Sequence, residues 1–183
     1  MAKIFISYRR KDTQGFAIAL YNQLRDRFGE EAIFMDIDVL KPGANFVEQL
    51  QMAVSKCEVL IALIGNQWLS IEDDDGNRRL DNPDDFVRVE IATAIERGIR
   101  VIPVLVMGAT MPDVHDLPNR LKMFASVQAF FITDRFNTDI SQLINLLEEE
   151  LLSDVPKTNV RRFLAITGYI LNVRSNLSTK DKI

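Results

Sequence analysis

The chain has 183 residues, 47% of them hydrophobic and 26% charged, and a formal net charge of −4. This length and composition fit about one globular domain with a real core, and they exclude a disordered or low-complexity chain. The acidic balance argues against nucleic acid as the main partner. Cys57 is the only cysteine, which excludes a disulfide framework or a cysteine-based zinc site within one chain.

The N-terminus leads directly into a strand-like run, with no extended apolar segment of the kind found in signal peptides. No stretch approaches the roughly 20 apolar residues of a membrane-spanning helix. We therefore expect a cytoplasmic protein without a transmembrane segment.

The first third of the chain alternates between strand and helix patterns. Residues 4–8 form a β-branched and aromatic run that predicts a strand, and residues 9–12 predict a polar turn. Apolar residues at helical spacing then continue to Gly29, which ends the first predicted helix. Residues 32–36 predict the second strand, and residues 37–44 a loop.

The middle third begins with a helix that Asn45 is predicted to cap, with Cys57 as inert packing on its apolar face. Residues 58–65 form a nearly continuous apolar run, typical of a parallel strand buried on both faces. The acidic loop at residues 72–81 resembles a calcium loop only in part, because the first and twelfth EF-hand positions fall on Ile71 and Asn82.

A helix followed by a buried strand is the clearest pattern in the chain. Asn82 is predicted as the N-cap, with Pro83 in the first helical position, and Gly98 as the end of the helix. Residues 99–106 then predict the fourth strand. Glu90 lies at the edge of the apolar stripe of this helix, with no lysine or arginine three or four residues away to pair with it.

The last elements are a fifth strand at residues 127–132 and a helix at residues 140–151. Strands alternating with helices predict an α/β fold: a flavodoxin-like, three-layer sandwich with a five-stranded parallel sheet in the order 2-1-3-4-5. Ligands of such folds bind at the carboxyl ends of the strands. This rule brings one set of residues to a common rim beside the start of the Glu90 helix: Ser7, Tyr8, Arg9, Asp36, Asp38, Asn66 and Trp68.

The sequence excludes three common functions of this fold. The turn after the first strand has no glycines, so it cannot be a dinucleotide-binding fingerprint, and no Walker A loop is present. A phospho-receiver would need acidic residues after the first strand and an aspartate at the end of the third. The corresponding residues here are 7–10 (SYRR) and 64–66 (IGN).

Four motifs, in this order along the chain, resemble those of TIR (Toll/interleukin-1 receptor) domains of the bacterial kind. The resemblance covers roughly residues 2–152. The motifs are residues 4–9 (IFISYR), residues 34–36 (FMD) with the Pro42-Gly43 loop, residues 64–69 (IGNQWL), and residues 86–91 (FVRVEI) followed by Arg97-Gly98.

The resemblance implies one of two activities. Many TIR domains cleave NAD⁺ at the nicotinamide–ribose bond to give ADP-ribose or a cyclic ADP-ribose product, whereas others are non-enzymatic scaffolds that only associate with other TIR domains. The catalytic glutamate of the first class lies on the helix after the third strand, and Glu90 takes that place. The leading hypothesis is an NAD⁺ glycohydrolase or ADP-ribosyl cyclase of anti-phage defence. NAD⁺ would be a substrate, with no cofactor or metal.

Other site residues follow from the resemblance with alternatives left open. Phe5, Tyr8 and Trp68 could give aromatic surface to the nicotinamide or adenine, or belong to the core or rim. Arg9 and Lys41 could meet the pyrophosphate, or be solvated surface charges.

Four further residues complete the predicted site. Ser7, Asp36 and Asp38 border the same rim, and the two aspartates could bind the substrate or only shape the loop. Phe86, also expected to bind the substrate, stands where bacterial members often have tryptophan; the aromatic ring keeps the packing role, whereas a specific task of the indole N–H would be lost.

Two segments are predicted to mediate association. Residues 37–44 correspond to the loop through which TIR domains commonly associate, so a homo-oligomer is expected. Residues 154–183 form a basic extension separate from the domain at residues 1–153; from residue 155 onward its net charge is +5, leaving −9 on the rest. Its heptad-like apolar stripe is compatible with packing on the domain, self-association or peripheral membrane contact.

Overall fold

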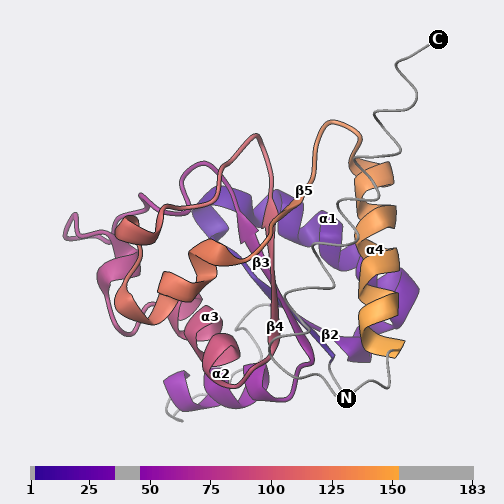
Figure 1. Cartoon of the computed structure of the whole chain (residues 1–183), viewed down its shortest axis with the longest axis horizontal. Helices are drawn as coiled ribbons and strands as arrows, with labels where there is room; N and C mark the ends of the chain where they lie inside the picture. Colours follow the sequence, from indigo (N-terminus) through magenta and orange to yellow (C-terminus); the bar gives the residue numbers. More distant parts are fainter. Residues whose placement is uncertain (1–2, 36–45, 153–183) are drawn as a thin grey trace. The chain divides into compact units, whose positions relative to one another are not determined.

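A parallel sheet of five strands forms the centre of the fold (Figure 1). The order β2-β1-β3-β4-β5 confirms the predicted flavodoxin-like topology. The strands are β1 (Ile4–Ser7), β2 (Ile33–Met35), β3 (Val59–Ile64), β4 (Arg100–Leu105) and β5 (Phe130–Phe131). In register, Ser7 at the end of β1 lies beside Ala62 of β3, which continues two residues further.

This computed structural model describes residues 3–35 and 46–152, all within the unit Met1–Ser153. The association loop at residues 37–44, the Asn45 cap and the C-terminal extension at residues 154–183 lie outside the described residues. Asp36, Asp38 and Lys41, which were predicted for the site, lie outside them too. Within the described ranges, no helix is long and apolar enough to cross a membrane.

Helices cover both faces of the sheet and make the predicted three layers. Helix α1 (Arg10–Phe28) lies beside α4 (Phe136–Leu152) on one face, and α2 (Phe46–Ser55) lies beside α3 (Phe86–Glu96) on the other (Figure 1). All six residues of β3 are buried, as its apolar sequence predicted. Short 3₁₀ helices connect the elements: η1 (Glu30–Ala32), η3 (Arg79–Asp81), η4 (Val114–Asp116) and η5 (Asn119–Ser126).

The boundaries of α1 and the fifth strand differ from the prediction. Helix α1 begins at Arg10, within the predicted polar turn, because the Arg9 carbonyl already accepts the backbone N–H groups of Asp12 and Thr13. The fifth strand is only two residues long, not six. The backbone N–H of Val127 bonds to the carbonyl of Phe124, within the preceding turn. Pairing with β4 therefore begins only at Phe130, three residues after the predicted start of the strand.

The first turn of α1 is tied to the end of β3 by one carboxylate. Asp12 accepts the backbone N–H groups of Gly65, at 3.0 Å, and Gln67, at 3.1 Å. These N–H groups follow a strand whose own pairing has ended, so the aspartate satisfies donors that would otherwise need water. The contact connects α1 to the carboxyl edge of the sheet, where the predicted site residues gather.

Candidate active site

Helix α3 carries Glu90 and begins three residues later than its predicted first position. Asp85 is the N-cap: its side chain accepts the backbone N–H of Arg88 at 3.0 Å. Asn82 instead closes the turn before the helix, where its side-chain oxygen accepts the backbone N–H of Asp84 at 2.9 Å. The predictions for Asn82 and Pro83 were therefore wrong. Asp85 is held in the cap position by a distant arginine, a contact that no local pattern reveals.

The C-terminal end of α3 confirms the prediction for Gly98. This glycine has a φ of 66°, and its N–H bonds to the carbonyl of Ile95 at 3.1 Å. The N–H of Ile99 bonds to the carbonyl of Ala94 at 2.8 Å. The two bonds make a Schellman motif, which only glycine enters without strain. Helix α3 thus has a defined length between two caps, with Glu90 near its middle.

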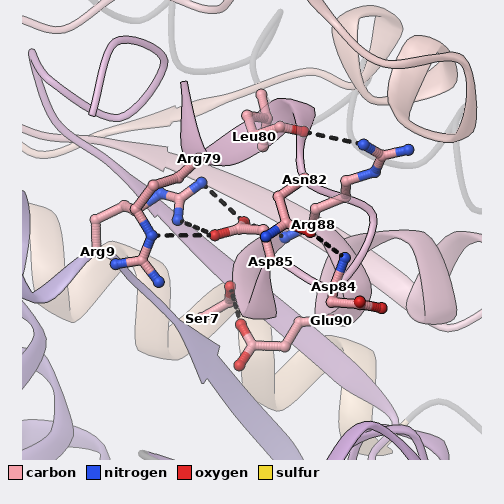
Figure 2. Close-up of polar contacts among 9 residues, drawn as sticks. All are labelled: Ser7, Arg9, Arg79, Leu80, Asn82, Asp84, Asp85, Arg88 and Glu90. Carbon is pink, nitrogen blue, oxygen red and sulfur yellow. Dashed lines mark hydrogen bonds and ion pairs between the residues drawn. The ribbon is translucent and has the colours of Figure 1, made fainter. Parts of the chain in front are cut away.

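The Glu90 carboxylate is buried and bonded to the central part of the sheet. Only 4% of the residue is exposed. The hydroxyl of Ser7, the last residue of β1, donates a hydrogen bond of 2.5 Å to Oε2 of Glu90 (Figure 2). Hydrogen bonds to ionised carboxylates are short and strong, so this bond fixes the direction of the carboxylate.

A buried ion pair makes a second link, between the segment that follows β1 and the N-cap of α3. Both terminal nitrogens of Arg9 donate to the Asp85 carboxylate, at 2.6 and 2.9 Å (Figure 2). The Nε of Arg79 approaches the same carboxylate at 3.5 Å. The Ser7–Glu90 and Arg9–Asp85 contacts together hold the first turns of α3 against the end of β1.

A cavity of about 530 Å³ opens beside Glu90. Its volume falls within the range of small-molecule sites. A neighbouring cavity of about 430 Å³ shares Lys11, Arg79 and Phe86 with it and is otherwise rich in acidic side chains. The first cavity is lined by Ile6, Tyr8, Arg9, Arg10, Lys11, Ile71, Arg79, Phe86, Val87 and Glu90.

The structure brings together part of the predicted site. Tyr8, Arg9, Phe86 and Glu90 line the first cavity, and Ser7 contacts Glu90 from beneath. Arg9 is not a solvated surface charge, because it is 3% exposed and paired with Asp85.

The structure places Phe5 and Trp68 in the core. Each is 1% exposed, and neither lines the cavity. Phe5 stacks on Phe34 with 5.3 Å between ring centroids, and Trp68 packs on Phe124 at 5.8 Å. The turn after β3 directs the indole inward instead of along the rim. Of their two predicted roles, the packing role is the one that this geometry fits.

Three cationic residues of the cavity were missed: Arg10, Lys11 and Arg79. The first two directly follow β1, so the rule that ligands bind at the carboxyl ends of strands could have found them. Arg79 begins the 3₁₀ helix η3 between β3 and α3, where no periodicity points to a site.

Two other features of the sequence have structural roles. Burial raises the pKa of the Cys57 thiol to about 12, so it stays protonated and inert at neutral pH, as predicted. In the acidic loop, the Asp73 carboxylate accepts the backbone N–H groups of Asp75 and Asn77, which builds a turn. Across residues 3–35 and 46–152, no group of three or more His, Cys, Asp or Glu side chains is placed to hold a metal ion.

Comparison with known proteins identifies the fold. The sequence model of a family described as "TIR domain" matches residues 4–144. No protein of curated function matches the sequence. A similar solved structure is that of the TIR domains of the "activated Roq1 resistosome directly recognizing the pathogen effector XopQ", with a TM-score of 0.57. It is 15% identical and covers 83% of this chain and 100% of its own, a likeness that shows the fold alone.

Proposed function

The chain belongs to the TIR domain family, and from that premise we propose that it cleaves NAD⁺ at the nicotinamide–ribose bond, with Glu90 as the catalytic residue. One observation carries the proposal: a buried carboxylate, oriented by a hydrogen bond from Ser7, lies on the wall of a cavity of about 530 Å³. A glutamate that served only the surface of a scaffold would have no need of this environment.

The chemistry needs little more than such a carboxylate. When the bond between C1′ of the ribose and the nicotinamide nitrogen breaks, both electrons leave with the nicotinamide, which departs neutral and needs no acid. The ribose becomes an oxocarbenium ion, and a fixed negative charge near it lowers the barrier. A water molecule then adds to C1′ and loses a proton, giving ADP-ribose. Attack by an atom of the substrate itself would give a cyclic product.

The rest of the cavity suits a dinucleotide. Tyr8 and Phe86 offer aromatic surface beside Glu90, against which a nicotinamide or adenine ring can pack. Phe86 is 37% exposed, so its ring is accessible without rearrangement of the core.

The proposal includes activation by self-association, in defence against phage. The similar solved structure is described as a resistosome, which is an assembly. The resemblance also implies association through residues 37–44, outside the described residues. An active site completed only on assembly would make the rate rise faster than linearly with protein concentration.

The test is nicotinamide release from NAD⁺ over a range of protein concentrations, with a crowding agent. We expect Glu90→Gln to lower the rate by about 100-fold or more, because the charge that stabilises the transition state is removed. Glu96→Gln is the matched control: it lies on the same helix but is exposed, and it should stay within about twofold.

Two results would contradict the proposal. The first is no release by the wild-type protein under conditions where light scattering shows that assemblies form, which would leave the scaffold function. The second is equal release by the wild-type protein and Glu90→Gln.

A further inference from the structure

Arg9 is not available for the anionic part of a dinucleotide, although it lines the cavity. Both of its terminal nitrogens donate to Asp85, and the two side chains are 3% and 1% exposed. Turning Arg9 toward a phosphate would leave the Asp85 charge buried without its main partner, which is strongly unfavourable. The anion must be recognised by another residue.

Arg79 differs from Arg9 in how it meets the same aspartate. It approaches Asp85 only through Nε, at 3.5 Å, and its side chain is 38% exposed. Figure 2 shows its two terminal nitrogens pointing away from Asp85. Among the residues that the structure describes, neither nitrogen has a hydrogen-bond partner. These nitrogens carry four of the five N–H donors of the guanidinium group, in the arrangement that binds phosphate with two parallel bonds.

The charge balance of this cluster favours an anion. Arg9 neutralises Asp85, and the other cations of the cavity wall, Arg10, Lys11 and Arg79, outnumber its one carboxylate, Glu90. The neighbouring cavity contains Glu72, Asp73, Asp74 and Asp84 and would repel phosphate. Electrostatics therefore favour an anionic group in the first cavity, beside Arg79 and Lys11, over the neighbouring acidic cavity.

We infer that Arg79, assisted by Lys11, binds the pyrophosphate group of the substrate in the cavity that Glu90 lines. The inference rests on the proposed function for the identity of the substrate. The anion site itself follows from the positions of the side chains. Arg79 would thus bind the pyrophosphate at the centre of the dinucleotide, while Glu90 contacts the ribose.

The test is calorimetric titration with inorganic pyrophosphate, ADP-ribose and adenosine. We expect Arg79→Gln to weaken the binding of pyrophosphate and ADP-ribose about tenfold or more, as loss of charged hydrogen bonds does, and to leave adenosine unaffected. Lys11→Gln should have a smaller effect. Arg78→Gln is the matched control, because Arg78 pairs with Asp81 and lines neither cavity; it should stay within about twofold.

Equal affinity of the wild-type protein and Arg79→Gln for ADP-ribose would overturn the inference, as would failure of the wild-type protein to bind pyrophosphate. A third outcome separates the two proposals. If nicotinamide release depends on Glu90, but Arg79→Gln has the same KM for NAD⁺ as the wild-type protein, the inference is wrong and the proposed function stands. Binding of pyrophosphate that depends on Arg79, in a protein that releases no nicotinamide, would support the anion site and reject NAD⁺ cleavage.

Discussion

Helix α3 has an arginine–carboxylate pair at each end, and the two pairs have similar hydrogen-bond lengths but differ strongly in their exposure to water. Arg9 meets Asp85 through two bonds of 2.6 and 2.9 Å. Arg120 meets Glu96 through two bonds of 2.8 and 2.9 Å. The side chains of the first pair are 3% and 1% exposed, and those of the second are 40% and 53% exposed.

Similar hydrogen-bond geometry therefore has different consequences for the fold. At the exposed end, water can replace either partner, and the free energy of the pair is small. At the buried end, a charge that loses its partner stays in a medium of low polarity. Distance alone does not show which pair matters to the site; burial does.

The largest expected effect is that of Asp85→Ser. Serine keeps the N-cap of α3 but leaves the Arg9 guanidinium buried without its main partner. We expect the free energy of unfolding to fall by about 3–5 kcal/mol in urea denaturation. Asp84→Ser, at the exposed neighbouring position, should change it by less than about 0.5 kcal/mol. Similar losses of unfolding free energy in the two variants would show that the buried pair stabilises the fold no more than an exposed residue does.

A second, smaller effect is the recovery that Arg9→Met should give when it is added to Asp85→Ser. Methionine fills much of the arginine volume and removes the uncompensated charge, so roughly 2 kcal/mol of the lost stability should return. Urea denaturation of both variants measures the difference. If the double variant is less stable than Asp85→Ser, the Arg9 side chain stabilises the fold through contacts other than its pair with Asp85.

The smallest effect belongs to Arg120→Gln. The hydrogen bond from Arg120 holds the pKa of Glu96 below its ordinary value of 4.5. A carboxyl group with a lowered pKa in the folded state stabilises the fold above its unfolded pKa, and this contribution is lost as the pH falls through the folded pKa. Arg120→Gln should raise the Glu96 pKa in an NMR titration while changing stability at pH 7 by less than about 0.5 kcal/mol. A larger loss would mean that the exposed pair resembles the buried one.

The parts of the fold that depend on neighbouring residues could be predicted from the sequence. Apolar runs located β1 and β3, helical spacing located α3, and Gly98 marked its end, because each signal lies within a few residues of the feature that it causes. The rule for parallel sheets then placed Ser7, Tyr8 and Glu90 at one edge.

The contacts that complete the site could not be predicted, because they join residues far apart in the chain. Asp85 is separated from Arg9 by 76 positions, and Glu90 from Ser7 by 83. Glu90 was therefore expected at the edge of the core, whereas its bond to Ser7 accompanies almost complete burial. For Trp68, the position directly after a strand favoured the rim of the sheet. In the structure its ring instead packs against Phe124 in the core.

The carboxylate of Asp12 occupies the space that a side chain at position 65 would enter. A Cβ atom built on Gly65 would lie 2.5 Å from Oδ1 of Asp12, closer than any ordinary contact. The two positions therefore constrain each other across 53 residues: a side chain at position 65 would displace the Asp12 carboxylate and disturb its bonds to the N–H groups of Gly65 and Gln67. Among divergent relatives, this geometry should be visible as covariation: glycine at the end of the third strand accompanies an acidic residue in the first turn of the first helix, and the two are lost together.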